Sequence, residues 1–298
     1  MPPAPTTTAG PPPAARARVG AAMAVASILS VQCGAALATT LFDSVGPQGA
    51  VFLRSLFGAL ALLALARGSL PPLRGRHLWD VVLFGVSLAG VNLCFYAALD
   101  RLPLGVAVTL EFVGPLGVAV FGSRRPRDLV WALLAAVGIL LLSDGAGGAG
   151  IDPLGAALAL AAGGFWAVYI LQSARVGNSY PGLGGLALAA TISAVIVAPF
   201  GIVQGGGELL TASALAVGLA VGLLSSAVPF ALELEALRRL PNAVFGVLMS
   251  LEPAVAAAVG FIALSQGLAL VEVLAIGLVV AACVGALRSA ATPPPRDG

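Results

Sequence analysis

The sequence predicts an all-α integral membrane protein, with ten transmembrane helices arranged as two inverted five-helix repeats. Composition, the lengths of the apolar runs and an internal repeat lead to this fold class. Of the 298 residues, 59% are hydrophobic and only 9% are charged, whereas a soluble domain carries about 25% charged residues. Apolar stretches of about 17 to 25 residues match a hydrocarbon core of roughly 30 Å when they are helical. The chain is therefore expected to lie in a membrane.

Ten apolar stretches of suitable length follow one another with short connections. The expected spans are 19–41, 47–67, 78–99, 104–122, 128–144, 153–174, 182–203, 212–234, 242–264 and 269–287. The ends, 1–18 and 288–298, are polar or rich in proline and are expected to be disordered tails. The Ala36-Leu37-Ala38 triplet also resembles a signal-peptide cleavage site. Because the apolar run continues to Phe42, we expect this segment to remain as the first span.

The arginines predict the orientation of the chain. All 15 basic residues are arginine, so the chain has no lysine for a Walker A motif or a Schiff base. One set of loops and both tails carry Arg16, Arg18, Arg67, Arg74, Arg76, Arg124, Arg125, Arg127, Arg175, Arg238, Arg239, Arg288 and Arg296. The opposite loops carry only Arg101. The positive-inside rule then places both termini in the cytoplasm.

An internal repeat divides the chain into two halves. An offset of 138 residues carries Arg101-Leu102-Pro103 onto Arg239-Leu240-Pro241 and also brings Pro115 onto Pro253. We take 19–144 and 153–287 as two homologous five-helix units. An odd number of spans inverts the second unit in the membrane. Inverted repeats place substrate sites near the midplane at the interface between the repeats.

Two glutamates occupy that depth. Glu111 and Glu252 lie near the middle of the fourth and ninth spans, where insertion of a charged group costs roughly 2.5–3.5 kcal/mol. Each stands close to a proline, Pro115 or Pro253, which cannot donate to the carbonyl four residues earlier and so kinks the helix. Unpaired backbone at membrane depth is tolerated where it lines a watery cavity. Glutamates and kinks together predict a substrate site, although ordinary transmembrane kinks with structural glutamates are the alternative.

The residues around these positions resemble the EamA-type branch of the drug/metabolite transporter superfamily, and most closely its threonine/homoserine exporter group. The matching stretches are 92–99, Leu102-Pro103, 110–115, 165–169, Pro229-Phe230 and Leu251-Glu252-Pro253. The resemblance covers 19–287, which is nearly the whole chain. It implies a ten-helix secondary carrier of the bacterial inner membrane that exports small metabolites. It also implies that the third, fourth, eighth and ninth spans line the path.

Arg54 is the other charged residue predicted well inside a span. A buried arginine nearly always pairs with acids or carbonyl groups, so we expect Arg54 to be the counter-ion of Glu111, Glu252 or a substrate carboxylate. Two carboxylates and one guanidinium leave one negative charge in excess, so one glutamate is expected to be protonated at neutral pH. We therefore expect proton antiport, in which the ammonium of an exported zwitterion replaces the proton on a glutamate.

Further polar residues are candidates for substrate contact. They are Gln32, Asn92, Tyr96, Ser225, Ser226, Trp166 and Tyr169. Each has a plainer role as a helix-packing hydrogen bonder or, for Tyr169, as an interfacial aromatic. Glu233 and Glu235 are expected to form solvated ion pairs with Arg238 and Arg239. Cys33, Cys94 and Cys283 fall inside spans and are expected to pack as small apolar residues.

Other classes of protein fit the sequence less well. An intramembrane enzyme needs a nucleophile or acid pair at depth, and the predicted spans contain no serine with an intramembrane histidine and no mid-span aspartate. A non-transporting sensor of the same fold stays open, as does efflux of drugs, purines or sugars in place of amino acids. The expected partners are a small-molecule substrate, protons and the lipid bilayer, with no nucleic acid, cofactor or metal. The sequence leaves the oligomeric state open.

Overall fold

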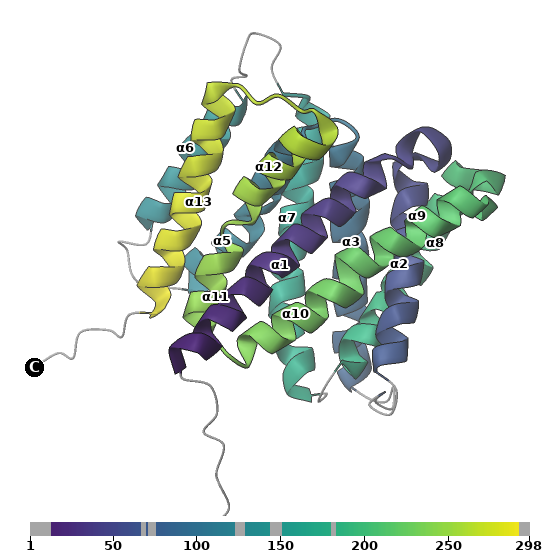
Figure 1. Cartoon of the computed structure of the whole chain (residues 1–298), viewed down its shortest axis with the longest axis horizontal. Coiled ribbons are helices and arrows are strands. Elements are labelled where there is room, and N and C mark those ends of the chain that lie inside the picture. Colours follow the sequence, from purple (N-terminus) through teal and green to yellow (C-terminus); the bar gives the residue numbers. More distant parts are fainter. Residues whose placement is uncertain are drawn as a thin grey trace, which may run out of the picture.

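The computed structural model describes residues 13–66, 70, 76–122, 129–143, 151–179 and 183–291. All the regular secondary structure of these residues is helical (Figure 1). The predicted tails lie outside the described residues at 1–12 and 292–298. The first helix begins at Pro13 and the last ends at Ala291. Proline favours the first position of a helix, where its missing N–H is not needed.

The helices follow the predicted spans, with breaks in three of them. Their bounds are α1 Pro13–Thr39, α2 Phe42–Leu65, α3 Arg76–Leu99, α4 Leu104–Glu111, α5 Val113–Gly122, α6 Leu129–Ser143, α7 Pro153–Ser179, α8 Gly184–Gly205, α9 Ala212–Gly222, α10 Val228–Leu237, α11 Asn242–Met249, α12 Glu252–Leu264 and α13 Leu270–Ala291. A 3₁₀ turn, Gly206–Leu210, connects α8 to α9, and a π-helical segment, η3 Leu223–Ala227, joins α9 to α10.

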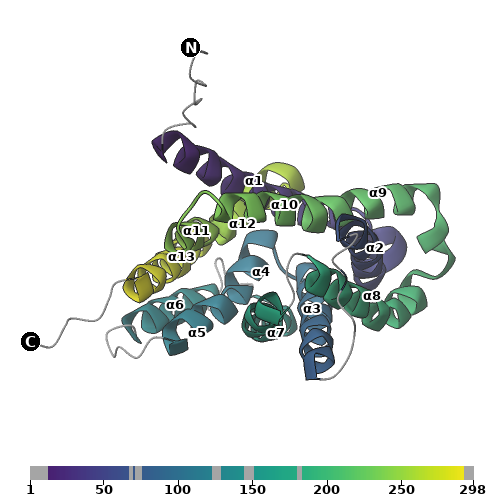
Figure 2. The same ribbon diagram turned by 90° about the horizontal axis from the view of Figure 1, so that it is seen from below.

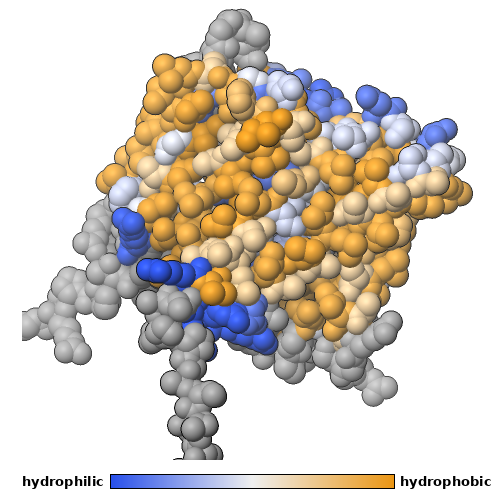
Figure 3. Space-filling view, in the orientation of Figure 1, coloured by the Kyte–Doolittle hydropathy of each residue, from blue (hydrophilic) through white to orange (hydrophobic). Residues whose placement is uncertain are grey.

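The surface is that of a membrane protein. Among the described residues, seven helical segments are long and apolar enough to cross a bilayer, and three shorter apolar helices accompany them. Large apolar side chains face outward, with exposed fractions of 88% for Phe121 and 80% for Ile262. Figure 3 shows an apolar surface across the middle of the molecule, with hydrophilic residues gathered toward its lower and upper edges. The chain is therefore a multi-pass membrane protein, and the count of ten spans stays a prediction.

The breaks in the fourth and ninth predicted spans have the same backbone geometry. Phe112 follows α4 and Ser250 follows α11, and both residues have φ −64° and ψ −11°. These positions are 138 residues apart, like the prolines that follow them. Because Pro115 and Pro253 lack an N–H, the helical hydrogen-bond ladder is interrupted just before each of them. Each helix therefore breaks within three residues before its proline.

The turns before the broken helices also repeat. The N–H of Leu102 donates to Ala98 O at 2.9 Å, and the N–H of Leu240 donates to Ala236 O at 2.9 Å. Each turn packs on a glycine of the other half of the chain. A Cβ atom at Gly155 would lie 2.9 Å from Leu102 Cγ, and one at Gly20 would lie 2.8 Å from Leu240 Cγ. The same close approach therefore occurs twice, with the halves exchanged.

Helices of the two halves pack in matched pairs. α2 lies on α8, α6 on α13, and α4 on α12, while α3 packs on α7 as α10 packs on α1 (Figures 1 and 2). This is the pattern expected of two repeats related by an approximate two-fold axis. α4 and α12 meet closely, since a Cβ atom at Gly105 would lie 2.6 Å from Ala257 Cα. α5 and α11, the other halves of the broken helices, contribute instead to the walls of a cavity.

Candidate functional site

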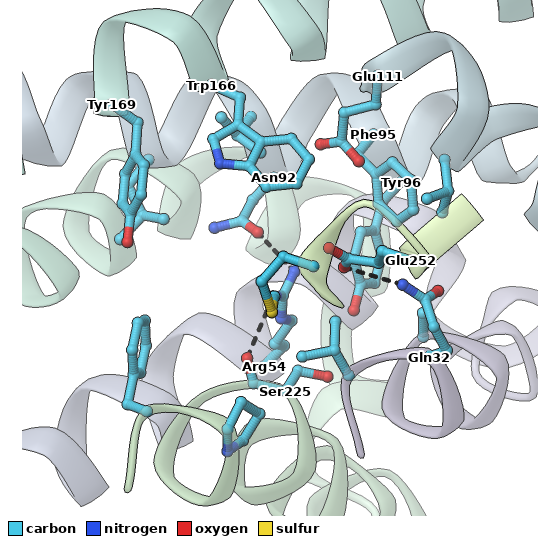
Figure 4. A pocket seen from close by; sticks show the side chains of 18 of the residues that line it. Gln32, Arg54, Asn92, Phe95, Tyr96, Glu111, Trp166, Tyr169, Ser225 and Glu252 are labelled. Carbon is cyan, nitrogen blue, oxygen red and sulfur yellow. Dashed lines mark hydrogen bonds between the residues drawn. The ribbon is translucent and has the colours of Figure 1, made fainter. Parts of the chain in front are cut away.

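A cavity of about 220 Å³, here called the polar cavity, lies between the broken helices and α1, α2, α3, α7 and α10. Figure 4 shows polar side chains converging on it from several helices. It is lined by Val31, Gln32, Ala35, Arg54, Leu88, Val91, Asn92, Phe95, Tyr96, Val108, Glu111, Trp166, Tyr169, Ser225, Pro229, Phe230, Glu233, Met249 and Glu252. Both glutamates are buried, each 7% exposed, so protein covers both acidic side chains.

The structure brings together most of the residues singled out from the sequence. Gln32, Arg54, Asn92, Tyr96, Glu111, Trp166, Tyr169, Ser225 and Glu252 all line the polar cavity. Ser226 does not line it. Its hydroxyl lies against Gly58 of α2, where a Cβ atom would come within 2.7 Å of Ser226 Oγ. Pro115 lines a neighbouring cavity, and Pro253 is buried behind Glu252.

The two glutamates differ in their hydrogen bonds. Gln32 Nε2 of α1 donates to Glu252 Oε1 at 3.0 Å, which fixes the direction of that carboxylate. No hydrogen bond joins the Glu111 carboxylate to another residue in the described part of the chain. Glu111 ends α4, while Glu252 begins α12, so the acids stand on opposite sides of equivalent helix breaks. The carboxylates enter one cavity from α4 and from α12 (Figure 4).

Arg54 does not pair directly with either glutamate. Within residues 13–66, 76–122 and 183–291, no ion pair of 4.0 Å or less connects them, so of the three expected counter-ions the substrate carboxylate stays a prediction. Its Nη1 donates to Asn92 Oδ1 at 2.5 Å, and its guanidinium carbon lies 5.5 Å from the centre of the Tyr96 ring. An amide and an aromatic face hold the cation in place without neutralising it. Its charge is left to attract a ligand anion.

The π-helical segment η3 supplies another partner of Arg54. Arg54 Nη2 donates to Ser225 O at 3.5 Å, and Ser30 Oγ donates to Leu224 O at 2.7 Å. Pro229 stands four residues after Ser225 and cannot donate to that carbonyl. The carbonyl is therefore free to accept from a side chain. π-Helical segments of this kind are frequent at functional sites, and no residue pattern directly indicated this one.

The backbone of Glu111 is packed against α7. A Cβ atom at Gly163 would lie 2.5 Å from Glu111 O, and one at Gly114 would lie 1.9 Å from Gly163 O. Glycine at both positions lets the helix break approach α7 this closely. Next to this crossing, the rings of Phe112 and Trp166 meet edge to face with centres 5.0 Å apart. The packing on α7 thus fixes the position of the Glu111 backbone, from which the carboxylate extends.

Glu233 is a site residue that was predicted to lie in a solvated ion pair instead. It lines the polar cavity, and Ser27 Oγ donates to its Oε1 at 2.7 Å. Its neighbour Glu235 forms the predicted ion pairs, at 3.0 Å with Arg238 and closely with Arg239. The spacing of four between Ser225, Pro229 and Glu233 places all three on one helical face. That spacing was a usable signal.

Several buried polar atoms of the cavity-lining residues have no hydrogen-bond partner. They are Tyr96 Oη, Ser225 Oγ and Gln32 Oε1. An unsatisfied buried polar group costs about 1–3 kcal/mol. Tyr96 and Ser225 stand next to Arg54, so the unsatisfied hydroxyl groups and the cation form one cluster on the wall of the cavity.

A second, larger cavity adjoins the first. It has a volume of about 450 Å³ and is here called the apolar cavity. It is lined by Phe112, Pro115, Leu116, Val118, Trp166, Ile170, Phe245, Gly246, Met249, Ser250, Glu252 and Cys283. Trp166, Met249 and Glu252 line both cavities and therefore form the wall between them. Glu111 lines the polar cavity alone.

Fold and site together define a class of protein. Apolar helices surround a cavity that is lined by two buried acids and a half-buried arginine, and paired broken helices from two similar halves meet there. This is the arrangement of a membrane transport protein. The EamA-like transporter family model matches residues 18–143 and again 153–288. The chain belongs to the EamA-like transporter family.

Individual relatives support the same assignment. The threonine/homoserine exporter RhtA of Escherichia coli K12 is 44% identical over 260 residues, which cover 87% of this chain and 88% of RhtA. RhtA of Salmonella typhimurium SL1344 is 44% identical over 257 residues, or 86% and 87% of the two chains. A solved crystal structure at 23% identity superposes with a TM-score of 0.62 and covers 91% of this chain and 96% of that chain. It shows the fold alone.

Proposed function

We propose that the protein is a secondary active exporter of small amino acids such as threonine and homoserine. The observation that carries this proposal is the convergence of the Arg54 guanidinium and three carboxyl groups, those of Glu111, Glu233 and Glu252, on a cavity of about 220 Å³ at the helix breaks. A zwitterionic amino acid has complementary charges. Its carboxylate would bind Arg54, and its ammonium would bind Glu252 or Glu111. The 44% identity to the threonine/homoserine exporters supports this substrate class.

The free side of Arg54 suits a carboxylate. Asn92 and Ser225 O accept from two of its nitrogens, which leaves further N–H groups of the five-donor fork. Arginine binds planar carboxylates through two parallel hydrogen bonds. The unsatisfied hydroxyl groups of Tyr96 and Ser225 then lie beside the bound carboxylate, where a substrate hydroxyl group would satisfy them.

Transport would be coupled to protons by antiport with alternating access. Three carboxylates and one guanidinium line the cavity, so negative charge is in excess when all of them are ionised, and protons or a substrate ammonium would neutralise it in turn. Glu252 is oriented by Gln32 and is assigned to the ammonium. Glu111, which has no such partner among the described residues, is assigned to the proton.

The proposed topology is ten spans in two inverted repeats, 19–144 and 153–287, in the bacterial inner membrane. The repeated turns and breaks support the two units. The arginine distribution supports cytoplasmic termini, because Arg175, Arg238 and Arg239 lie on the predicted inner side and Arg101 alone on the outer side. On this orientation, the packed pair α4 and α12 forms the outer half of the broken helices. The apolar cavity between α5 and α11 then faces the cytoplasm.

The proposal is tested by counterflow in liposomes that contain the purified protein. Labelled threonine outside should accumulate in vesicles preloaded with unlabelled threonine. The rate of threonine efflux driven by a pH gradient should saturate as the threonine concentration rises. The matched control substrate is 2-aminobutyrate, which is threonine or homoserine without its hydroxyl group. A site that hydrogen-bonds a substrate hydroxyl group rejects the analogue that lacks it, so 2-aminobutyrate should compete poorly.

Two results would count against the proposal. If a panel of amino acids gives no counterflow while a purine, sugar or drug does, the substrate class is wrong. If no solute in the panel exchanges at all, the protein is a non-transporting member of the family. Threonine counterflow without any net threonine efflux in response to a pH gradient would support the substrate class and contradict the proton coupling.

A further inference from the structure

The apolar cavity has the chemical character of a binding site of its own. Its volume of about 450 Å³ falls within the roughly 300–1,000 Å³ typical of small-molecule pockets. Aromatic rings of Phe112, Trp166 and Phe245 and aliphatic side chains make up most of its wall. Within this described lining, Glu252 is the one ionisable acid and no basic residue is present. An occupant should therefore be largely apolar and carry one positive charge.

We propose that the apolar cavity binds lipophilic monoammonium compounds, whose ammonium group pairs with Glu252 while their apolar part lies against Phe245 and Trp166. The geometry of Glu252 supports this assignment. Gln32 donates to one carboxylate oxygen, Oε1, from the side of α1, which leaves the other oxygen for a second donor. Tryptophan and phenylalanine faces also attract an ammonium cation. An anion of the same shape would be repelled by Glu252, and a neutral isostere would lose the ion pair.

Such a ligand would block the polar cavity without filling it. Glu252 is shared between the two cavities, whereas Glu111 lines the polar cavity alone. A carboxylate that pairs with a ligand ammonium on one side cannot take the substrate ammonium on the other. The apolar cavity thus has a lining of its own, and a ligand bound there would compete with the substrate for Glu252. Only this competitive effect rests on the proposed amino-acid transport.

The test uses 4-phenylbutylamine as the probe and measures its binding to the full-length protein in detergent by isothermal titration calorimetry. The matched ligands are 4-phenylbutanol, which is neutral, and 4-phenylbutyrate, which is an anion. The amine should bind at least about tenfold more tightly than either. Glu252→Gln should reduce its affinity by about tenfold or more, while Glu111→Gln should leave it within about twofold.

A pair of phenylalanine variants locates the apolar part of the ligand. Phe245 lines the apolar cavity, and Phe230 lines the polar cavity. Phe245→Ala should weaken amine binding and Phe230→Ala should not. Size-exclusion profiles and thermal unfolding of each variant identify any that fails to fold, and Glu252→Asp, which keeps the charge, serves as the second variant for that position. Retained binding in Glu252→Asp with loss in Glu252→Gln supports the ion pair.

The outcomes separate this proposal from the proposed function. Equal binding of amine, alcohol and acid would overturn it, as would loss of binding in Glu111→Gln with retention in Glu252→Gln. If the amine binds with the expected pattern but the protein transports no amino acid, the binding-site proposal stands and the proposed transport function is wrong. Threonine counterflow that the amine inhibits competitively supports both.

Discussion

The two broken helices, α4–α5 and α11–α12, share a backbone and differ in chemistry. Their break residues, Phe112 and Ser250, have the same φ and ψ values of −64° and −11°. However, the acid precedes the break in the first helix and follows it in the second, and only Glu252 accepts a hydrogen bond from Gln32. The repeat preserves the kink, which creates the cavity. The charged groups around the kink are free to diverge and can take separate roles in one transport cycle.

The asymmetry extends to the helices that surround the breaks. α2 contributes Arg54 to the polar cavity, whereas its partner α8 contains no charged residue within Gly184–Gly205. α4 and α12 are packed together, while α5 and α11 border a cavity. A fold built from two similar halves therefore holds a cavity lined by one cation and unequal acids. Substitutions at positions where the two halves differ should show whether the residues there have different roles in transport.

The largest expected effect comes from exchanging the acids for amides. Glu252→Gln should reduce threonine counterflow by about 100-fold, because the substrate ammonium loses its charged hydrogen-bond acceptor. The hydrogen bond by which Gln32 orients this side chain would also change. Glu111→Gln should keep counterflow, which needs no net proton movement, and lose efflux driven by a pH gradient. Both are measured in the same vesicles. If the two variants behave identically, the division of roles between the breaks is wrong.

Removing the cation should have the next largest effect. Arg54→Ala should reduce threonine counterflow by about tenfold to 100-fold, since it removes the carboxylate partner and leaves Asn92 Oδ1 unpaired. Arg54→Lys keeps the charge and cannot form the fork of parallel hydrogen bonds. We expect it to recover part of the activity through a raised KM. Full activity in Arg54→Ala would show that the charge of α2 is not used for substrate.

Much of this arrangement could be predicted from local sequence. The effect of Pro115 and Pro253 on a helix depends on the missing N–H, and burial of Glu111 and Glu252 follows from their place in apolar runs. The 138-residue offset between the two prolines predicts that the two breaks are equivalent. These properties belong to single helices, so a single sequence contains them.

The partners of Arg54 could not be predicted, because they depend on other helices. Asn92 comes from α3, and the carbonyl of Ser225 becomes available only in the π-helical segment before Pro229. In the same segment Ser225 lines the polar cavity, while Ser226 faces α2. The two serines are adjacent and chemically identical, so their sequence does not separate them. Tertiary packing distinguishes them.

A smaller effect should come from the crossing between the first break and α7. Gly163→Ala would place a Cβ atom 2.5 Å from Glu111 O, so the break and α7 must separate. Overpacking of this kind destabilises by about 1–3 kcal/mol. The neighbouring Gly164→Ala is the control, because a Cβ atom there meets nothing within 4 Å. Thermal unfolding in detergent should show a lower Tm for the first variant only. Equal Tm values would mean that the break tolerates a wider spacing.

The smallest expected effect concerns the turns that precede the broken helices. Arg101 pairs with Asp152 at 3.4 Å, whereas Ala17 occupies the position equivalent to Asp152 when Gly20 and Gly155 are aligned. The N–H of Gly155 donates to Asp152 at 2.7 Å. This hydrogen bond, followed by the charge of Arg101, holds the pKa of Asp152 below its usual value. Asp152 is solvent-exposed, so its contribution is screened and small.

The sign of the pH dependence follows from that lowered pKa. Because the carboxyl is more acidic in the folded protein, its stabilisation is present above the unfolded pKa of about 3.9 and is lost as the pH falls through the folded value. Asp152→Asn should therefore lower Tm slightly at pH 7, and the difference from the natural protein should vanish toward pH 3. The measurement is thermal unfolding across that range. If the Tm difference persists at pH 3, the effect comes from the hydrogen bond that caps α7. In that case the ion pair with Arg101 does not distinguish the stability of the two turns.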